Sequence, residues 1–130
     1  MSQLIALEGI DGSGKTTLAR LLSDALNLIG VPHILTREPG GTLLGKSLRQ
    51  LLLDPQNDPT PTTELLLYAA DRAQHVQTVI KPALERGQTV ITDRYTASTI
   101  AYQHYGRGLP LGTIVELNRL ATGGLWPKHT

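Results

Sequence analysis

Short apolar runs alternate along the chain with longer segments in which apolar residues recur every three to four positions. The runs Leu4 to Leu7, His33 to Thr36 and Thr89 to Thr92 predict buried strands, because they are short, apolar or β-branched and bounded by loops. The helix-period segments cover residues 15 to about 29, about 43 to 53, 63 to about 86, 97–104 and 112–121. This alternation predicts an α/β fold with a parallel sheet.

Two of the predicted helices carry further local signals. The first has apolar residues on one face and Gly30 just beyond its end, and these apolar residues are Leu18, Leu21, Leu22, Ala25 and Leu26. The helix over 63–86 contains Pro82, which is expected to kink it. Three prolines between residues 54 and 61 indicate a surface connection before this helix.

Composition narrows the class of protein. A length of 130 residues corresponds to one domain, here 1–130, and a net charge of +1 excludes a broad basic field for unspecific nucleic-acid binding. The lack of cysteine excludes disulfides, thiolate metal sites and cysteine nucleophiles. With neither a signal peptide nor an apolar run long enough to span a membrane, we expect a cytoplasmic protein without membrane or nucleic-acid partners.

The segment from Gly9 to Thr16 fits the pattern G-x-x-x-x-G-K-[ST] between a predicted strand and a predicted helix. In such a loop the glycines let backbone N–H groups surround phosphates, Lys15 reaches the outer phosphates, and the Thr16 hydroxyl binds Mg²⁺. An accidental glycine-rich turn is the alternative. The predicted ATP-binding residues are Gly9, Ile10, Asp11, Gly12, Ser13, Gly14, Lys15, Thr16 and Thr17.

Asp93 and Arg94 follow the third predicted strand. Asp93 is expected beside the first strand at the carboxyl edge of the sheet, where it would be the carboxylate on the magnesium side of the site. Its alternative role is to cap the next helix. Arg94 is expected to point into the same cleft, with a solvent-exposed arginine as the alternative.

Tyr68 and Arg72 lie four residues apart and therefore on one helix face, where an aromatic plane and a guanidinium can hold a base and its phosphate. A core-covering Tyr and an Arg paired with Asp71 or Glu64 are equally compatible with the spacing.

The segment Arg37-Glu38-Pro39-Gly40-Gly41 is expected at the same sheet edge, as a ligand-contacting loop or as a tight turn. The histidines receive no function, because their spacing at 33, 75, 104 and 129 does not suit a metal site.

Together these segments resemble the thymidylate kinase family, which phosphorylates dTMP with ATP. The resemblance runs from Leu4 to the end of the chain, and its motifs are residues 8–17, 37–42, 68–72, 93–95 and 101–103. It implies a three-layer P-loop kinase fold, with a parallel sheet flanked by helices, of which this chain holds the N-terminal portion with three strands. It also implies an ATP-dependent phosphotransferase with a phosphate acceptor, Mg²⁺ as cofactor, and a homodimer in the full-length protein.

The resemblance also implies residue roles. Asp11 would meet the sugar 3′-hydroxyl of dTMP and the magnesium shell. Tyr68 would stack on thymine, and Arg72 would bond the base edge. Arg94 would grip the dTMP phosphate and act in catalysis with Lys15 and Asp93. Tyr102 would crowd the 2′ position, and Gln103 would lie beside the base. Arg37 and Glu38 would line the acceptor site, and Thr16 and Asp93 would bind the metal.

Two departures from the family pattern bear on activity. Gly12 stands where some members carry an arginine, so the chain resembles the subtype whose extra basic groups lie in a mobile lid. That lid and the last strands would lie beyond Thr130, and we therefore expect a fragment that binds ligands with little turnover.

Other readings remain open. A deoxynucleoside kinase would use an uncharged acceptor, and a nucleotide-binding switch would need a base-reading motif such as N-K-x-D, which the sequence lacks. A fragment whose bare sheet edge pairs with another chain is the third alternative.

Overall fold

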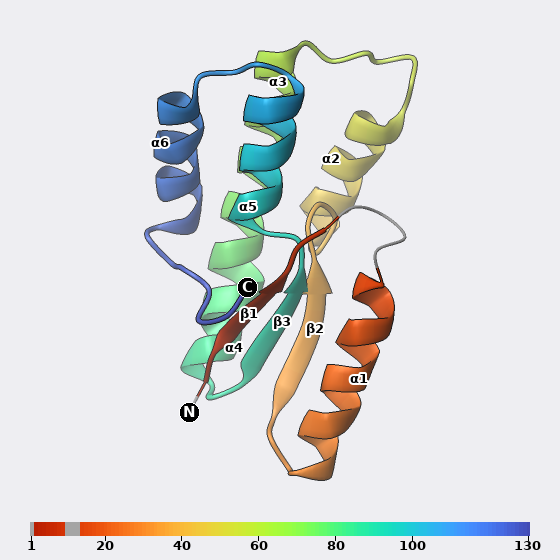
Figure 1. Ribbon diagram of the computed structural model, residues 1–130, viewed down its shortest axis with the longest axis vertical. Coiled ribbons are helices and arrows are strands. Elements are labelled where there is room, and N and C mark those ends of the chain that lie inside the picture. Colours follow the sequence, from red (N-terminus) through yellow and green to blue (C-terminus); the bar gives the residue numbers. More distant parts are fainter. Residues whose placement is uncertain (1, 10–13) are drawn as a thin grey trace.

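Three parallel strands form the sheet in the order β1-β3-β2, as drawn in Figure 1 for a computed structural model that describes residues 2–9 and 14–130. Their bounds are Leu4–Leu7 for β1, His33–Arg37 for β2 and Thr89–Asp93 for β3. The register pairs Leu7 and Arg37 with Asp93 on either side. The predicted parallel sheet is confirmed, and the three strands end together at one edge.

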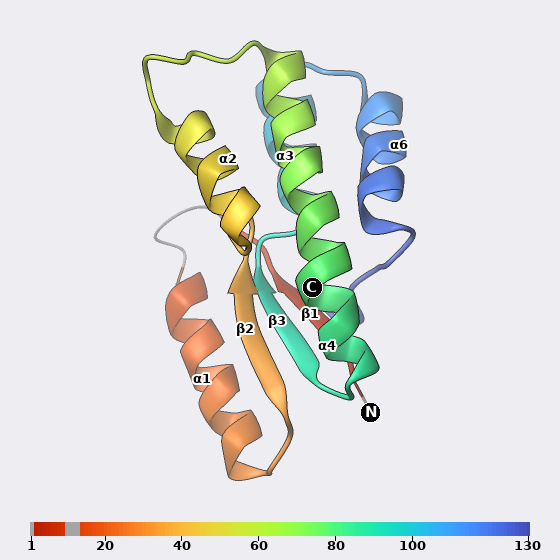
Figure 2. The same cartoon turned by 180° about the vertical axis from the view of Figure 1, so that it is seen from behind.

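Helices flank the sheet and extend beyond its carboxyl edge. They are α1 (Lys15–Leu28), α2 (Leu43–Leu53), α3 (Pro61–His75), η1 (Val76–Ile80), α4 (Lys81–Glu85), α5 (Thr96–Thr99), η2 (Ile100–Gly106) and α6 (Leu111–Thr122). The connection from β1 to β2 and the connection from β2 to β3 run along the sheet in opposite directions. Right-handed crossovers therefore place α1 on one face of the sheet and the α3–α4 rod, which is the continuous helical segment α3–η1–α4 over residues 61–85, on the other. Figure 2 shows α3 and α4 over one face.

The structure refines the predicted elements. The bounds of β1 and α2 are confirmed, whereas the segment predicted as one kinked helix over 63–86 consists of α3, the π-helical η1 and α4. The widened turn η1 ends two residues before Pro82, whose ring would clash with a carbonyl one turn earlier in a regular α-helix. The apolar face of α1 is largely open, with Leu18 51% and Leu21 60% exposed.

The core lies between β1, β3 and the α3–α4 rod. It includes Leu4, Ala6, Ile80 and Val90, and it is closed at the carboxyl edge by the ring of Tyr95, whose residue is fully buried. This packing fixes the ends of the strands, and therefore the position of the residues that follow them.

The outer edge of β1 is not wholly bare in the described part of the chain. The Lys128 N–H donates to the Leu4 carbonyl at 2.7 Å, and the Ala6 N–H donates to the His129 carbonyl at 2.9 Å. Ile5 and His129 thereby form a parallel bridge. Within the described residues, no helix is both long and apolar enough to cross a lipid bilayer.

Candidate functional site

The first part of the site lies where β1 and β3 end. Lys15, the first residue of α1, places its Nζ 3.0 Å from Asp93 Oδ1. Gly9 and Gly14 have φ values of 153° and 92°, in the region that favours glycine. The predicted ligand residues Ile10, Asp11, Gly12 and Ser13 lie outside the described residues. The structure thus brings Lys15 and Asp93 together, as the motif predicts.

The side chains at this point suit a hard divalent cation. Apart from the ion pair with Lys15, Asp93 Oδ1 is buried without a hydrogen-bond partner among residues 2–9 and 14–130. Thr16, one residue after Lys15, is exposed at the N-terminus of α1 and offers a hydroxyl. One carboxylate and one hydroxyl, with phosphate and water oxygens completing the shell, are a donor set that Mg²⁺ accepts. These two residues fit the predicted metal role.

A pocket of about 270 Å³ opens next to this edge, between α2, α3 and the α5–η2 helix. Six of the predicted acceptor-site residues line it, namely Glu38, Tyr68, Arg72, Arg94, Tyr102 and Gln103. The predicted residue Arg37 is exposed at the end of β2 and is not part of this lining. The volume is close to the lower end of the range of roughly 300–1,000 Å³ for small-ligand sites.

A buried carboxylate organises the floor of this pocket. Glu38 accepts a 2.6 Å bond from Arg72 Nε through Oε1, and its Oε2 lies 2.7 Å from His75 Nδ1. The second ring nitrogen of His75 lies 2.6 Å from the hydroxyl of Thr36. Because Arg72 and His75 are three residues apart on α3, one helix turn holds both oxygens of the carboxylate. Glu38 pairs with Arg72, and neither of the pairings considered for Arg72, with Asp71 or Glu64, occurs.

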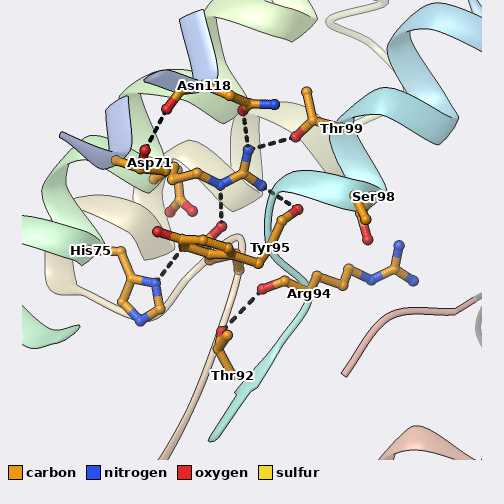
Figure 3. Close-up of polar contacts among 12 residues, drawn as sticks. Asp71, His75, Thr92, Arg94, Tyr95, Ser98, Thr99 and Asn118 are labelled. Carbon is orange, nitrogen blue, oxygen red and sulfur yellow. Dashed lines mark hydrogen bonds and ion pairs between the residues drawn. The ribbon is translucent and has the colours of Figure 1, made fainter. Parts of the chain in front are cut away.

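The guanidinium of Arg72 is held on several sides, by groups that include Tyr95, Thr99 and Asn118, which are labelled in Figure 3. Its Nη1 donates to Thr99 Oγ1 and to Asn118 Oδ1, each at 2.7 Å, and its Nη2 donates to the Tyr95 carbonyl at 2.8 Å. With the bond to Glu38, four of its five N–H groups are used within the described residues. The remaining N–H, on Nη2, is available to a ligand in the pocket.

Arg94 occupies a strained turn directly after β3. Its φ of 73° is rare for a residue other than glycine, and its carbonyl accepts a 3.0 Å bond from Thr92 Oγ1. The side chain extends away from Asn118 and His75 in Figure 3, and its guanidinium carbon lies 5.4 Å from the centre of the Tyr102 ring. The prediction that Arg94 points into the cleft is consistent with this placement, because both residues line the pocket.

Glu8, at the end of β1, stabilises this turn. Its carboxylate accepts bonds from the N–H groups of Tyr95 and Ala97, each at 2.9 Å, and from Ser98 Oγ at 2.6 Å. A carboxylate at this position satisfies the free N–H groups at the start of α5. The residue that follows β1 and precedes the predicted phosphate loop therefore also holds the segment that carries Arg94.

Burial shifts three acid groups in or near the pocket. Desolvation raises the pKa of Asp71, with the bond from the Gly40 N–H acting in the opposite direction. Desolvation also raises the pKa of Tyr68, assisted by the charge of Glu64, and it raises the pKa of Tyr95. The two tyrosines therefore remain neutral at physiological pH, which suits stacking and packing rather than acid–base chemistry.

Sequence reasoning missed four residues that shape the site. Arg49 lines the pocket from α2, and Glu8, His75 and Asn118 hold its walls through the bonds described above. The helical period does place His75 on the face of Arg72 and could have found it. Nothing in the sequence links Arg72 to Asn118, because they are 46 residues apart on different helices.

Comparisons with known proteins identify one family. The family model of thymidylate kinase matches residues 7–130. A thymidylate kinase of Synechococcus sp. (strain CC9311) is 59% identical over all of this chain, and one of Synechococcus sp. (strain JA-3-3Ab) is 61% identical over 97% of it. The crystal structure of thymidylate kinase from Ehrlichia chaffeensis is 48% identical and superposes with a TM-score of 0.90, covering 97% of this chain and 71% of that one.

The relatives are longer than this chain. It spans 65% of the strain CC9311 protein and 61% of the strain JA-3-3Ab protein. The shared part contains the three-stranded sheet, the start of α1 and the pocket.

Proposed function

This chain belongs to the thymidylate kinase family, and on that premise we propose that it supplies the phosphate loop and acceptor pocket for transferring the γ-phosphoryl group of ATP to dTMP. The observation that carries the proposal is a pocket with three arginines, Arg49, Arg72 and Arg94, next to the Lys15–Asp93 pair. Positively charged side chains at this site would attract the two polyanions, ATP and dTMP, and bring them together.

The ATP side is built on the loop between β1 and α1. We assign ATP binding to residues 9–17, whose backbone N–H groups and helix N-terminus favour phosphate, with Lys15 on the outer phosphates. Thr16 and Asp93 would hold Mg²⁺, which when bound neutralises phosphate charge. The Lys15–Asp93 ion pair keeps both side chains at the carboxyl edge, ready for phosphates and metal.

The acceptor side is built on α3 and the α5–η2 helix. Tyr68 would stack on thymine, and the free N–H of Arg72 would bond its edge, with Gln103 beside the base. Arg94 would bind the phosphate of dTMP, while Tyr102 restricts the 2′ position. Asp11 would meet the sugar hydroxyl, and Glu38 acts by fixing Arg72. Arg37 stays a prediction, as do the homodimer and the cytoplasmic location.

The proposed reaction needs little covalent help from the protein. The attacking oxygen belongs to an already ionised phosphate, so no general base is required. Catalysis then depends on alignment and on neutralising charge, which Lys15 would provide beside Asp93 and Arg94 would provide from the pocket.

A competition experiment tests this function. Isothermal titration calorimetry would compare dTMP, dUMP, UMP and thymidine, and ADP formation from ATP and Mg²⁺ would be followed with and without dTMP. We expect dTMP to bind more tightly than thymidine and UMP, because the phosphate meets Arg94 and because Tyr102 disfavours a 2′-hydroxyl. Tighter binding of thymidine would instead indicate a deoxynucleoside kinase.

A further inference from the structure

The amide of Gln103 has a fixed partner on one side. Gln103 is 1% exposed and lines the pocket, and its Nε2 donates a 2.7 Å bond to Glu64 Oε1. Glu64 lies in the first turn of α3, four residues before Tyr68, and is itself not part of the pocket lining. The two residues therefore connect the helix that carries Tyr68 to η2.

This bond determines the orientation of the Gln103 side-chain amide. An ionised carboxylate only accepts hydrogen bonds, so the NH₂ end of Gln103 must face Glu64. Its oxygen end, on the other arm of the amide, forms no hydrogen bond within residues 2–9 and 14–130 and is not fully buried, so it is accessible from the pocket that Gln103 lines. An accessible amide oxygen can accept a hydrogen bond from a ligand in the pocket. The pocket thus offers an acceptor at Gln103.

The same pocket, which Arg72 also lines, offers a donor. The guanidinium of Arg72 has one N–H left after its bonds to Glu38, Thr99, Asn118 and Tyr95. A donor beside an acceptor matches a carbonyl beside an N3–H, the pattern of thymine and uracil. Cytosine has an unprotonated N3, which would face the Gln103 oxygen with two lone pairs opposed.

We propose that Glu64 is a positioning residue which sets the Gln103 amide so that its oxygen faces the base, and that it thereby selects an imide-type pyrimidine over cytosine. The inference rests on the proposed function, since it takes the pocket as the site of the nucleotide base. Glu64 acts only through Gln103, and its effect is on the choice of base.

The test measures dissociation constants by isothermal titration calorimetry for dTMP, dUMP, dCMP and N3-methyl-dTMP. In the unaltered chain, dTMP and dUMP are expected to bind at least about tenfold more tightly than dCMP and N3-methyl-dTMP, since only the first pair donates from N3. Glu64→Gln can donate or accept, so it leaves the Gln103 amide free to turn, and the preference for dTMP over dCMP should fall by about fivefold or more.

Two further variants make the test specific. Glu64→Ala removes the partner altogether and should also reduce the preference, while Glu116→Gln changes a 70% exposed glutamate of α6 and should leave it unchanged. Thermal denaturation reports whether each variant is folded. A folded Glu64 variant that keeps the full preference overturns the inference, as does equal binding of dTMP and N3-methyl-dTMP. If the unaltered chain binds no dTMP, the proposed function fails first; if it binds dTMP and dCMP equally, only the inference fails.

Discussion

Replacing Glu38 with glutamine tests the buried charge cluster beneath the pocket. The side chains of Glu38 and Arg72 are 2% and 3% exposed, and their atoms Oε1 and Nε are 2.6 Å apart. Glu38→Gln keeps the shape but removes the negative charge, so the Arg72 guanidinium stays buried beside a neutral amide. Breaking one partner of a buried ion pair costs roughly 3–5 kcal/mol, and we expect about 3 because the amide still accepts a bond.

The expected fall in melting temperature follows from this loss of folding free energy. For 130 residues the unfolding entropy is about 0.27 kcal/mol per kelvin, so a loss of about 3 kcal/mol lowers Tm by about 11 °C. Circular dichroism melts at pH 7 measure it, with Glu116→Gln as the exposed control, for which we expect a shift under about 2 °C. A fall of less than about 2 °C for Glu38→Gln would refute the view that this cluster supports the pocket.

Three further predictions concern the surroundings of the site. Because burial raises the pKa of Asp71, the folded state favours the protonated form of this carboxyl group. Its contribution to stability is present below about pH 3.8 and is lost as the pH rises. Asp71→Asn should therefore raise Tm more at pH 7 than at pH 4, as measured by thermal melts across this range. Gly41→Ala should destabilise by roughly 1–3 kcal/mol in urea denaturation, because a Cβ there would lie 2.5 Å from the Arg37 carbonyl, whereas at Gly112 it would meet nothing within 4 Å and Gly112→Ala should not destabilise. Glu8→Gln should weaken dTMP binding in calorimetry, because one amide oxygen cannot replace the three bonds that hold the turn after Arg94.

The sequence predicts most of the sheet and the position of its functional edge. β1 and α2 have the predicted bounds, and Asp93 lies beside Leu7 as expected, because parallel strands linked by right-handed crossovers must end together. Local sequence signals are therefore sufficient to predict these elements. The phosphate-loop motif also predicts the approach of Lys15 to Asp93, since its helix begins at that lysine.

Tertiary pairing explains what the sequence leaves open. Spacing alone leaves the partner of Arg72 undecided, and the fold provides Glu38, which lies 34 residues away. The sequence does not predict the π-helical turn η1 either, because one extra residue per turn hardly changes the spacing of the apolar residues. The helical period places His75 on the face of Arg72, but its role depends on Glu38 reaching the same helix turn.

The phosphate-binding role of Arg94 is tested most directly by calorimetry with dTMP and thymidine on the unaltered chain and on Arg94→Ala. A charge-assisted hydrogen bond contributes about 1.5–3 kcal/mol, so we expect dTMP to bind at least about tenfold more tightly than thymidine, and this difference to be largely lost in Arg94→Ala. An unchanged preference for dTMP in the variant would contradict the assignment of Arg94, and with it the acceptor pocket.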